Sequence, residues 1–175
     1  EALLARALEG VSQPPKLAVL ALAAPVAGDE IPLTNGNWIV RPKELAARFG
    51  IARVHALNDF EAIAHALPKL MEADLQPVGP AASFPDGIKL VIGPGTGLGA
   101  AALVPSAKGH RVIATEAGHM SFGPAYPDEM MIFHRLLERH TPLSVEHVLS
   151  GAGLARLHRA MHPALIALKP EMILR

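Results

Sequence analysis

The segment IKLVIGPGTGLGAAALV, residues 88–104, determines how the rest of the chain is interpreted. It predicts a strand over Leu90–Ile92, a glycine-rich loop over Gly93–Gly99 and a second strand over Ala100–Val104. Glycines let backbone N–H groups approach an anion closely, and a threonine in the loop can add a hydroxyl donor. The loop is neither a Rossmann GxGxxG nor a Walker A motif, because no Lys-Ser/Thr follows and the next segment has the pattern of a strand. A phosphate-binding loop and an ordinary tight hairpin both remain open at this point.

Strands and helices alternate on both sides of this segment, which predicts an α/β fold with mixed rather than purely parallel pairing. Upstream, we expect an amphipathic helix over 1–9, a strand buried on both faces over 17–24, a hairpin over about 26–34, a helix from Pro42 to Gly50, a strand over 53–57 and a helix from Asp59. Downstream, we expect a strand over about 111–115 and helices over 127–139 and 150–161.

A stretch rich in proline and glycine, residues 72–87, marks the likeliest boundary along the chain, with Pro77, Gly79, Pro80, Pro85 and Gly87. We therefore divide the chain into a first α/β part over residues 1–70, a hinge or linker over 71–87, and a second α/β part over 88–175.

The composition excludes several classes of protein. The chain has 175 residues, with 16 Lys+Arg against 16 Asp+Glu and no cysteine. A balanced charge lacks the positive field that drives nonspecific nucleic-acid binding. The absence of cysteine excludes disulfide scaffolds, cysteine-ligated zinc and iron–sulfur clusters, and it fits a reducing cytoplasm. The longest apolar run, Leu17–Ala24, is too short to cross a bilayer, so we expect neither a nucleic-acid nor a membrane partner.

Four polar side chains are candidates for chemistry, and each has a structural alternative. Asp59 follows a strand, where it could accept a proton from a substrate hydroxyl or simply cap a helix. Glu116 and His119, three residues apart in a polar loop, could bind neighbouring hydroxyls or lie in an ordinary exposed loop. Glu146 precedes a helix and could be a binding, capping or solvated carboxylate.

Taken together and in order, five motifs resemble the bacterial glucokinases of the hexokinase/actin-like ATPase superfamily. They are LAxAxPVxGDxxxLTNxxW at residues 20–38, NDF at 58–60, GPGTGLG at 93–99, EAGHMSF at 116–122 and SVEHVLSGAGL at 144–154. The resemblance runs from about residue 17 to residue 160.

The resemblance implies a ribonuclease H-like/actin-like fold, here incomplete, and transfer of the ATP γ-phosphoryl group to the 6-hydroxyl of glucose with Mg²⁺. It implies that Asp59 is the catalytic base. The implied sugar-binding residues are Asn35, Asn58, Asp59, Glu116, His119 and Glu146, and the implied phosphate-binding residues are Gly95, Thr96, Gly97 and Gly99. It also implies a cytoplasmic homodimer whose ligands are glucose and ATP.

The chain departs from the family at both ends. The family's initial D-x-G-G-T-N phosphate loop and its later Gly-Gly adenosine-binding segment do not occur in these 175 residues. We therefore expect a chain truncated at both ends, with the latter part of a small α/β domain over residues 1–70, a hinge or linker over 71–87 and the first part of a large α/β domain over 88–175. We expect this chain to be inactive as an isolated fragment. A non-catalytic sugar-binding or regulatory remnant and an actin-like structural protein or ATPase remain as alternatives.

Overall fold

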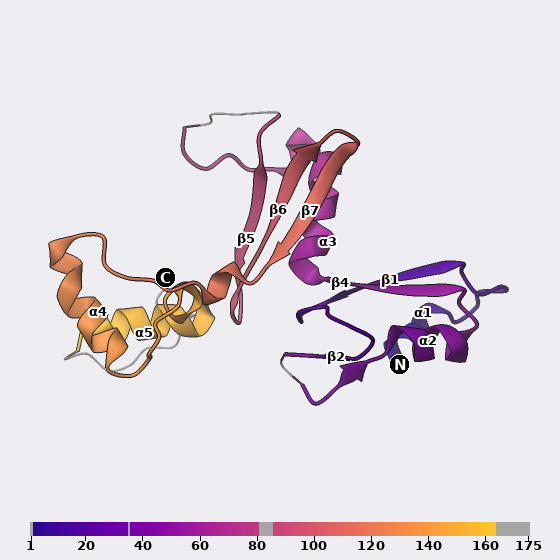
Figure 1. The fold of residues 1–175 in the computed structure, drawn as a ribbon, viewed down its shortest axis with the longest axis horizontal. Helices are drawn as coiled ribbons and strands as arrows, with labels where there is room; N and C mark the ends of the chain where they lie inside the picture. Colours follow the sequence, from indigo (N-terminus) through magenta and orange to yellow (C-terminus); the bar gives the residue numbers. More distant parts are fainter. Residues whose placement is uncertain (1, 35, 81–85, 164–175) are drawn as a thin grey trace. The chain divides into compact units, whose positions relative to one another are not determined.

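The computed structural model describes residues 2–34, 36–80 and 86–163. The chain divides into two structural units, Glu1–Met71 and Glu72–Arg175 (Figure 1). The first unit contains α1 (Ala2–Ala7), β1 (Leu17–Leu22), β2 (Ile31–Pro32), β3 (Ile39–Val40), α2 (Pro42–Phe49), β4 (Arg53–Asn58), α3 (Asp59–Ala66) and the 3-10 helix η1 (Leu67–Lys69). The second contains η2 (Glu72–Asp74), β5 (Lys89–Pro94), β6 (Leu98–Ser106), β7 (Gly109–Thr115), η3 (Ala117–His119), η4 (Pro127–Glu129), α4 (Met130–Leu137), η5 (Val145–His147) and α5 (Gly151–Met161).

The first unit is built on two parallel strands, β1 and β4, in register from Leu17 opposite Arg53 to Leu22 opposite Asn58. Helix α2 packs against β4, and α3 packs against both strands. The connection between parallel strands passes through a helix, as such crossovers require. This arrangement places Asn58 at the carboxyl end of β4, directly before α3.

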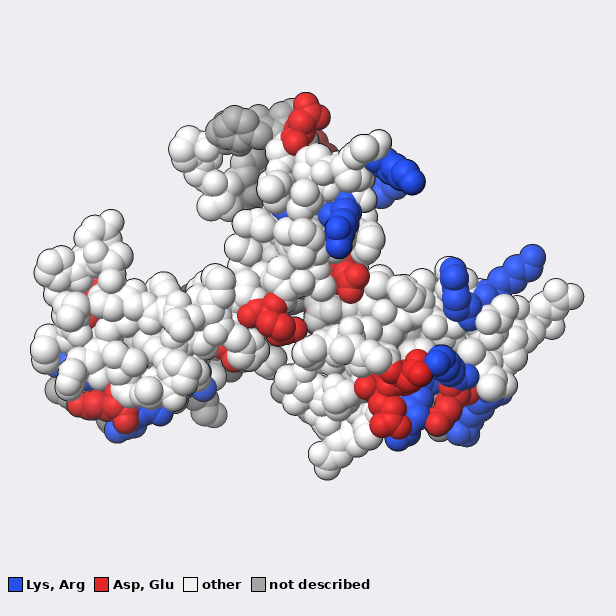
Figure 2. Space-filling view, viewed as in Figure 1, with Lys and Arg blue, Asp and Glu red and all other residues white. Residues whose placement is uncertain are grey.

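Helix α2 begins and ends where its sequence predicts. Pro42 occupies the first turn, where its missing N–H has no intrahelical partner to lose. Gly50 closes the helix in the left-handed conformation, with φ of 63°. Near the start of α2, acidic and basic side chains alternate on the surface (Figure 2), and Arg41 Nε lies 2.8 Å from Glu30 Oε1.

Two expectations for the first unit are wrong. The hairpin lies at β2 and β3, with Ile31 paired to Val40, and not at 26–34. The residues before Ile31 form a turn, where Gly28 has φ of 76°. Strand β1 is not buried on both faces: within the described residues it pairs with β4 alone, and Leu17 and Val19 are 44% and 54% exposed.

The second unit carries a three-stranded antiparallel sheet in the order β5-β6-β7. The glycine-rich segment is almost entirely strand, because Gly93 pairs with Gly99 and Pro94 pairs with Leu98. The expected loop over 93–99 is therefore wrong, and the turn is reduced to residues 95–97. Pro94 is tolerated because β5 is an edge strand of this sheet. Mixed pairing, parallel in one unit and antiparallel in the other, agrees with the predicted fold class.

Helices α4 and α5 pack against each other in the second unit. Their core is formed by buried side chains from both helices and from the segment between them: Phe133, Leu136, Leu143 and Ala160. No helix in the described part of the chain has both the length and the apolar character needed to cross a bilayer. The division of the chain into the proposed small-domain, hinge and large-domain segments stays a prediction.

Candidate functional site

Three segments of the second unit meet at the turn between β5 and β6. The amide of Gly151 donates to Gly95 O over 2.8 Å, which attaches the start of α5 to the turn. The amide of Val145 donates to Met120 O over 3.0 Å, which attaches η5 to the segment after η3. The turn, η3 and η5 therefore form one assembly, although 48 residues separate Leu98 from Glu146.

Glu116, His119 and Glu146 form a row of three side chains in this assembly. His119 Nδ1 lies 3.6 Å from Glu116 Oε2, and His119 Nε2 lies 3.6 Å from Glu146 Oε1. These separations are slightly longer than hydrogen bonds, so both ring nitrogens face carboxylates without being tightly bound to them. The histidine is 66% exposed and Glu146 is 28% exposed. Such a row can accept and donate several hydrogen bonds to a ligand that carries adjacent hydroxyls.

The position of Glu146 depends on a glycine in the turn. Glu146 Oε2 accepts a hydrogen bond of 3.4 Å from the backbone N–H of Leu98. A Cβ added at Gly97 would lie 2.7 Å from that carboxylate oxygen. Gly97 thus leaves the space through which the Glu146 carboxylate reaches the hairpin.

A second glycine places η3 against the hairpin. A Cβ at Gly118 would collide with the carbonyl oxygen of Leu98 and would approach Leu98 Cβ to 3.1 Å. Gly118 is buried, whereas Glu116 and His119 on either side of it are exposed. The absence of a side chain at Gly118 lets the backbone of η3 contact β6 while its polar neighbours face outward.

At the hairpin tip, some of the groups expected to bind an anion already interact within the chain. The N–H of Gly95 already donates to Gly97 O over 2.8 Å, and Thr96 is engaged by a neighbouring group. Gly99 lies within β6, opposite Gly93. Among the described residues, no group of three or more His, Cys, Asp or Glu side chains is arranged to hold a metal ion. The described residues therefore do not form a metal site by themselves.

In the first unit, Asn58 is the N-cap of α3. Its Oδ1 accepts hydrogen bonds from the amides of Phe60 and Glu61 at 2.9 and 3.3 Å, and its Nδ2 donates to Ala24 O at 3.2 Å. One amide hydrogen of the side chain remains for a ligand. Asn58, rather than Asp59, therefore has the capping role.

Asp59 is the first residue of α3 and is only partly buried. Its Oδ1 accepts a hydrogen bond of 3.0 Å from the amide of Phe60, which leaves Oδ2 for other partners. A carboxylate at this position is favoured by the helix dipole and remains accessible. Asn35 lies outside the described residues, so its predicted role is not addressed.

Several residues that hold this site were not predicted to belong to it, although Ser150 is expected from the sequence to cap a helix. The His147 ring accepts at Nδ1 from the amide of Ser144 over 3.0 Å, and the Ser144 hydroxyl lies 2.9 Å from the same nitrogen. The hydroxyl of Ser150 donates to Glu146 O over 2.7 Å and accepts from the amide of Gly153. Ser144 and Ser150 thus fix the backbone on both sides of Glu146. The S-x-x-H spacing at 144–147, which matches a capping box, was the available signal.

Comparisons with known proteins agree with these motifs. The model of the glucokinase family matches residues 1–172. The chain is 45% identical over 150 residues to a glucokinase of Chelativorans sp. (strain BNC1), covering 86% of this chain and 44% of the relative. It is 40% identical over 164 residues to a glucokinase of Mesorhizobium japonicum, covering 94% and 48%.

Among solved structures, the glucokinase of an Antarctic psychrotroph aligns with a TM-score of 0.75 at 31% identity, covering 87% of this chain and 48% of that one. This similarity confirms the predicted fold class. The chain spans about half the length of these relatives.

Proposed function

Since the chain belongs to the glucokinase family, we propose that the full-length protein transfers the γ-phosphoryl group of ATP to the 6-hydroxyl of glucose. The observation that carries this proposal is the row formed by Glu116, His119 and Glu146. His119 lies 3.6 Å from each carboxylate, and Glu146 is fixed against the glycine-rich hairpin. A row of two acceptors and one donor or acceptor is suited to the adjacent hydroxyls of a hexose ring.

In this proposal the three side chains bind and orient the sugar. Each carboxylate accepts hydrogen bonds from ring hydroxyls, and His119 supplies a further donor or acceptor according to its tautomer. The partial burial of Glu146 strengthens its hydrogen bonds by reducing competition from water. Glu116 and His119 contribute from the exposed side of η3.

Asp59 acts as the base in the proposed reaction. It accepts the proton of the 6-hydroxyl as that oxygen attacks the γ-phosphorus, while the bond from the γ-phosphorus to the bridging oxygen of ADP breaks. Phosphoryl transfer depends mainly on positioning and on neutralising charge, so one correctly placed carboxylate suffices for the proton. Bound Mg²⁺ would arrive with ATP and neutralise charge on its phosphates. Asn58 orients the start of α3 and offers its remaining amide hydrogen to the sugar.

The test is steady-state kinetics of the full-length protein with glucose and Mg·ATP. We expect glucose-dependent formation of ADP, and we expect Asp59→Asn to lower kcat by about 10²–10⁴-fold because the general base is lost. Asp29→Asn is the matched control: it removes an exposed carboxylate of the same unit that forms an ion pair with Lys43. Its kcat should stay within about twofold of wild type, since exposed ion pairs contribute little.

Three outcomes would contradict the proposal in different ways. If Asp59→Asn retained the wild-type kcat, the base assignment would be wrong. If glucose bound to the full-length protein but no ADP formed, the protein would be a sugar-binding module without phosphoryl transfer. ADP formation that did not depend on sugar would instead indicate an ATPase.

A further inference from the structure

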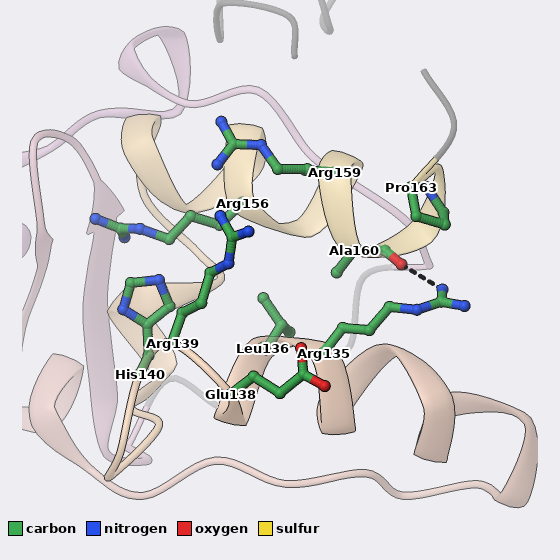
Figure 3. Close-up of a pocket in the computed structure, with 9 residues that line it drawn as sticks. All are labelled: Arg135, Leu136, Glu138, Arg139, His140, Arg156, Arg159, Ala160 and Pro163. Carbon is green, nitrogen blue, oxygen red and sulfur yellow. Dashed lines mark hydrogen bonds between the residues drawn. The ribbon is translucent and has the colours of Figure 1, made fainter. Parts of the chain in front are cut away.

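A cavity of about 400 Å³ lies between α4 and α5, in the second unit. Its volume falls within the range of small-molecule sites, roughly 300–1,000 Å³. Its lining consists of Arg135, Leu136, Glu138, Arg139, His140, Arg156, Arg159, Ala160 and Pro163 (Figure 3). Leu136 and Ala160, both almost fully buried, give the cavity an apolar floor. The cavity shares no residue with the row of Glu116, His119 and Glu146.

The lining of this cavity is strongly basic in a chain whose formal net charge is zero. The lining contains four arginines and one carboxylate, that of Glu138. Glu138 Oε1 lies 3.5 Å from His134 Nδ1 and is not paired with any arginine in the described part of the chain. Within residues 2–34, 36–80 and 86–163, no carboxylate oxygen comes within 4.0 Å of any of the four guanidinium groups. Uncompensated positive charges in one concave site attract an anion of matching charge.

One of these four arginines stabilises a helix end, and this structural role does not explain the other three. Arg135 Nη1 donates to Ala160 O over 2.7 Å in the last turn of α5, an ordinary interaction of a cation with a helix C-terminus. Arg156 makes only a long contact of 3.5 Å to His147 O. Arg139 and Arg159 have no side-chain hydrogen bond to another described residue. Among the residues that the structure describes, their N–H groups therefore have no acceptor and could donate to a ligand.

The lowered pKa of His140 reflects its burial and the positive charges around the cavity. Figure 3 shows Arg139 and His140 projecting from the segment that follows α4, next to Arg156 of α5. Burial lowers the pKa of His140, and the charges of Arg156, His147 and Arg139 lower it further. Its ring stacks on that of His147 with centroids 4.9 Å apart. The imidazole is therefore mainly neutral near pH 7, and a bound anion would raise its pKa.

We propose that the cavity between α4 and α5 binds a small phosphate-bearing anion through Arg139, Arg156 and Arg159. A guanidinium group can donate two hydrogen bonds to two oxygens of one phosphate. Three guanidinium groups therefore match a ligand with two negative charges better than a ligand with a single carboxylate. The cavity is large enough for a phosphate ester with part of its organic group, which would pack on Leu136 and Ala160. The proposal does not depend on the proposed function.

The experiment titrates inorganic phosphate into the full-length protein at low salt and follows the imidazole C–H resonance of His140 by NMR. We expect a saturable shift. Arg139→Gln/Arg156→Gln should weaken phosphate binding by about tenfold or more, because each charged hydrogen bond contributes strongly. Arg111→Gln, which removes an exposed arginine of β7 that does not line the cavity, should change it by no more than about twofold. AMP and glucose 6-phosphate form the other arms and identify which ester, if either, binds more tightly than phosphate alone.

A gain-of-binding variant keeps the proposal testable if the double variant does not fold. Glu138→Gln removes the one carboxylate of the lining and should tighten phosphate binding by about two- to fivefold. The proposal is overturned if the His140 resonance does not respond saturably to phosphate or to either ester. It is also overturned if folded Arg139→Gln/Arg156→Gln binds as wild type does, or if Glu138→Gln binds no more tightly than wild type. Because the readout is local to His140, phosphate bound at the hairpin of residues 95–97 would not imitate this result.

Discussion

Replacing Gly118 by alanine should move η3, with Glu116 and His119, away from η5, which carries Glu146. The added Cβ would collide with Leu98 O, and it would come within 3.1 Å of Leu98 Cβ and 3.2 Å of the Leu98 carbonyl carbon. These are mostly backbone atoms of a strand that is paired with β5 and β7, so they cannot rotate away. Either η3 or β6 must move. Forced overpacking of this kind costs about 1–3 kcal/mol, and a clash with backbone belongs at the upper end of that range.

The assay is thermal unfolding of wild type, Gly118→Ala and the matched control Gly123→Ala. A Cβ at Gly123 meets nothing within 4 Å, so this control makes the same chemical change five positions away without a clash. For a unit of roughly 100 residues, each kcal/mol lowers Tm by about 4–8 °C. We expect the Tm of Gly118→Ala to fall by about 8–20 °C, whereas the control should stay within about 2–3 °C of wild type.

Glucose affinity provides the second readout. Displacement of η3 moves Glu116 and His119 away from Glu146, so Gly118→Ala should weaken glucose binding by about tenfold or more at a temperature where the protein is folded. If Gly118→Ala were as stable as Gly123→Ala and bound glucose equally well, the close approach of η3 to β6 would not be what positions the site.

Three further predictions concern other residues. Gly97→Ala should weaken glucose binding by about tenfold while lowering the free energy of unfolding by less than about 1 kcal/mol, because the obstructing atom is the end of the flexible Glu146 side chain; an unchanged Kd in calorimetry would contradict it. Asn58→Ala should lower the free energy of unfolding by about 1–2 kcal/mol through loss of the N-cap of α3, measured by urea denaturation, and retention of full stability would argue against the cap. NMR titration should place the pKa of His140 below its ordinary value of 6.5, so that its contribution to stability is present above that pH and is lost as the pH falls through the folded-state pKa. A pKa at or above 6.5 would contradict the burial and neighbouring charges described for this ring.

Local signals in the sequence predicted the elements that depend on neighbouring residues. Pro42 and Gly50 determine the ends of α2, and Ser150 caps α5, because these effects act within one turn of helix. The hairpin was misplaced because the turn at Gly28 resembles a hairpin turn, although the pairing strand begins only at Ile31.

The candidate site was only partly predictable, for a different reason. The spacing of Glu116 and His119 placed them on one loop, which η3 retains. The approach of Glu146 to Leu98 depends on Gly97, and the approach of η3 to Leu98 depends on Gly118; each glycine leaves space for residues distant in sequence. Close contacts between distant segments leave no periodic pattern in the local sequence. The arginine-lined cavity was not predicted for the same reason, because its lining comes from two separate helices and the residues that follow them.

The most direct test of the account is ³¹P NMR of the full-length protein incubated with glucose and Mg·ATP. We expect a new phosphomonoester resonance that appears only with glucose and matches glucose 6-phosphate. We also expect Asp59→Asn to form this product about 10²–10⁴-fold more slowly while glucose still binds. Absence of any sugar phosphate from folded, glucose-binding wild-type protein would contradict the central claim.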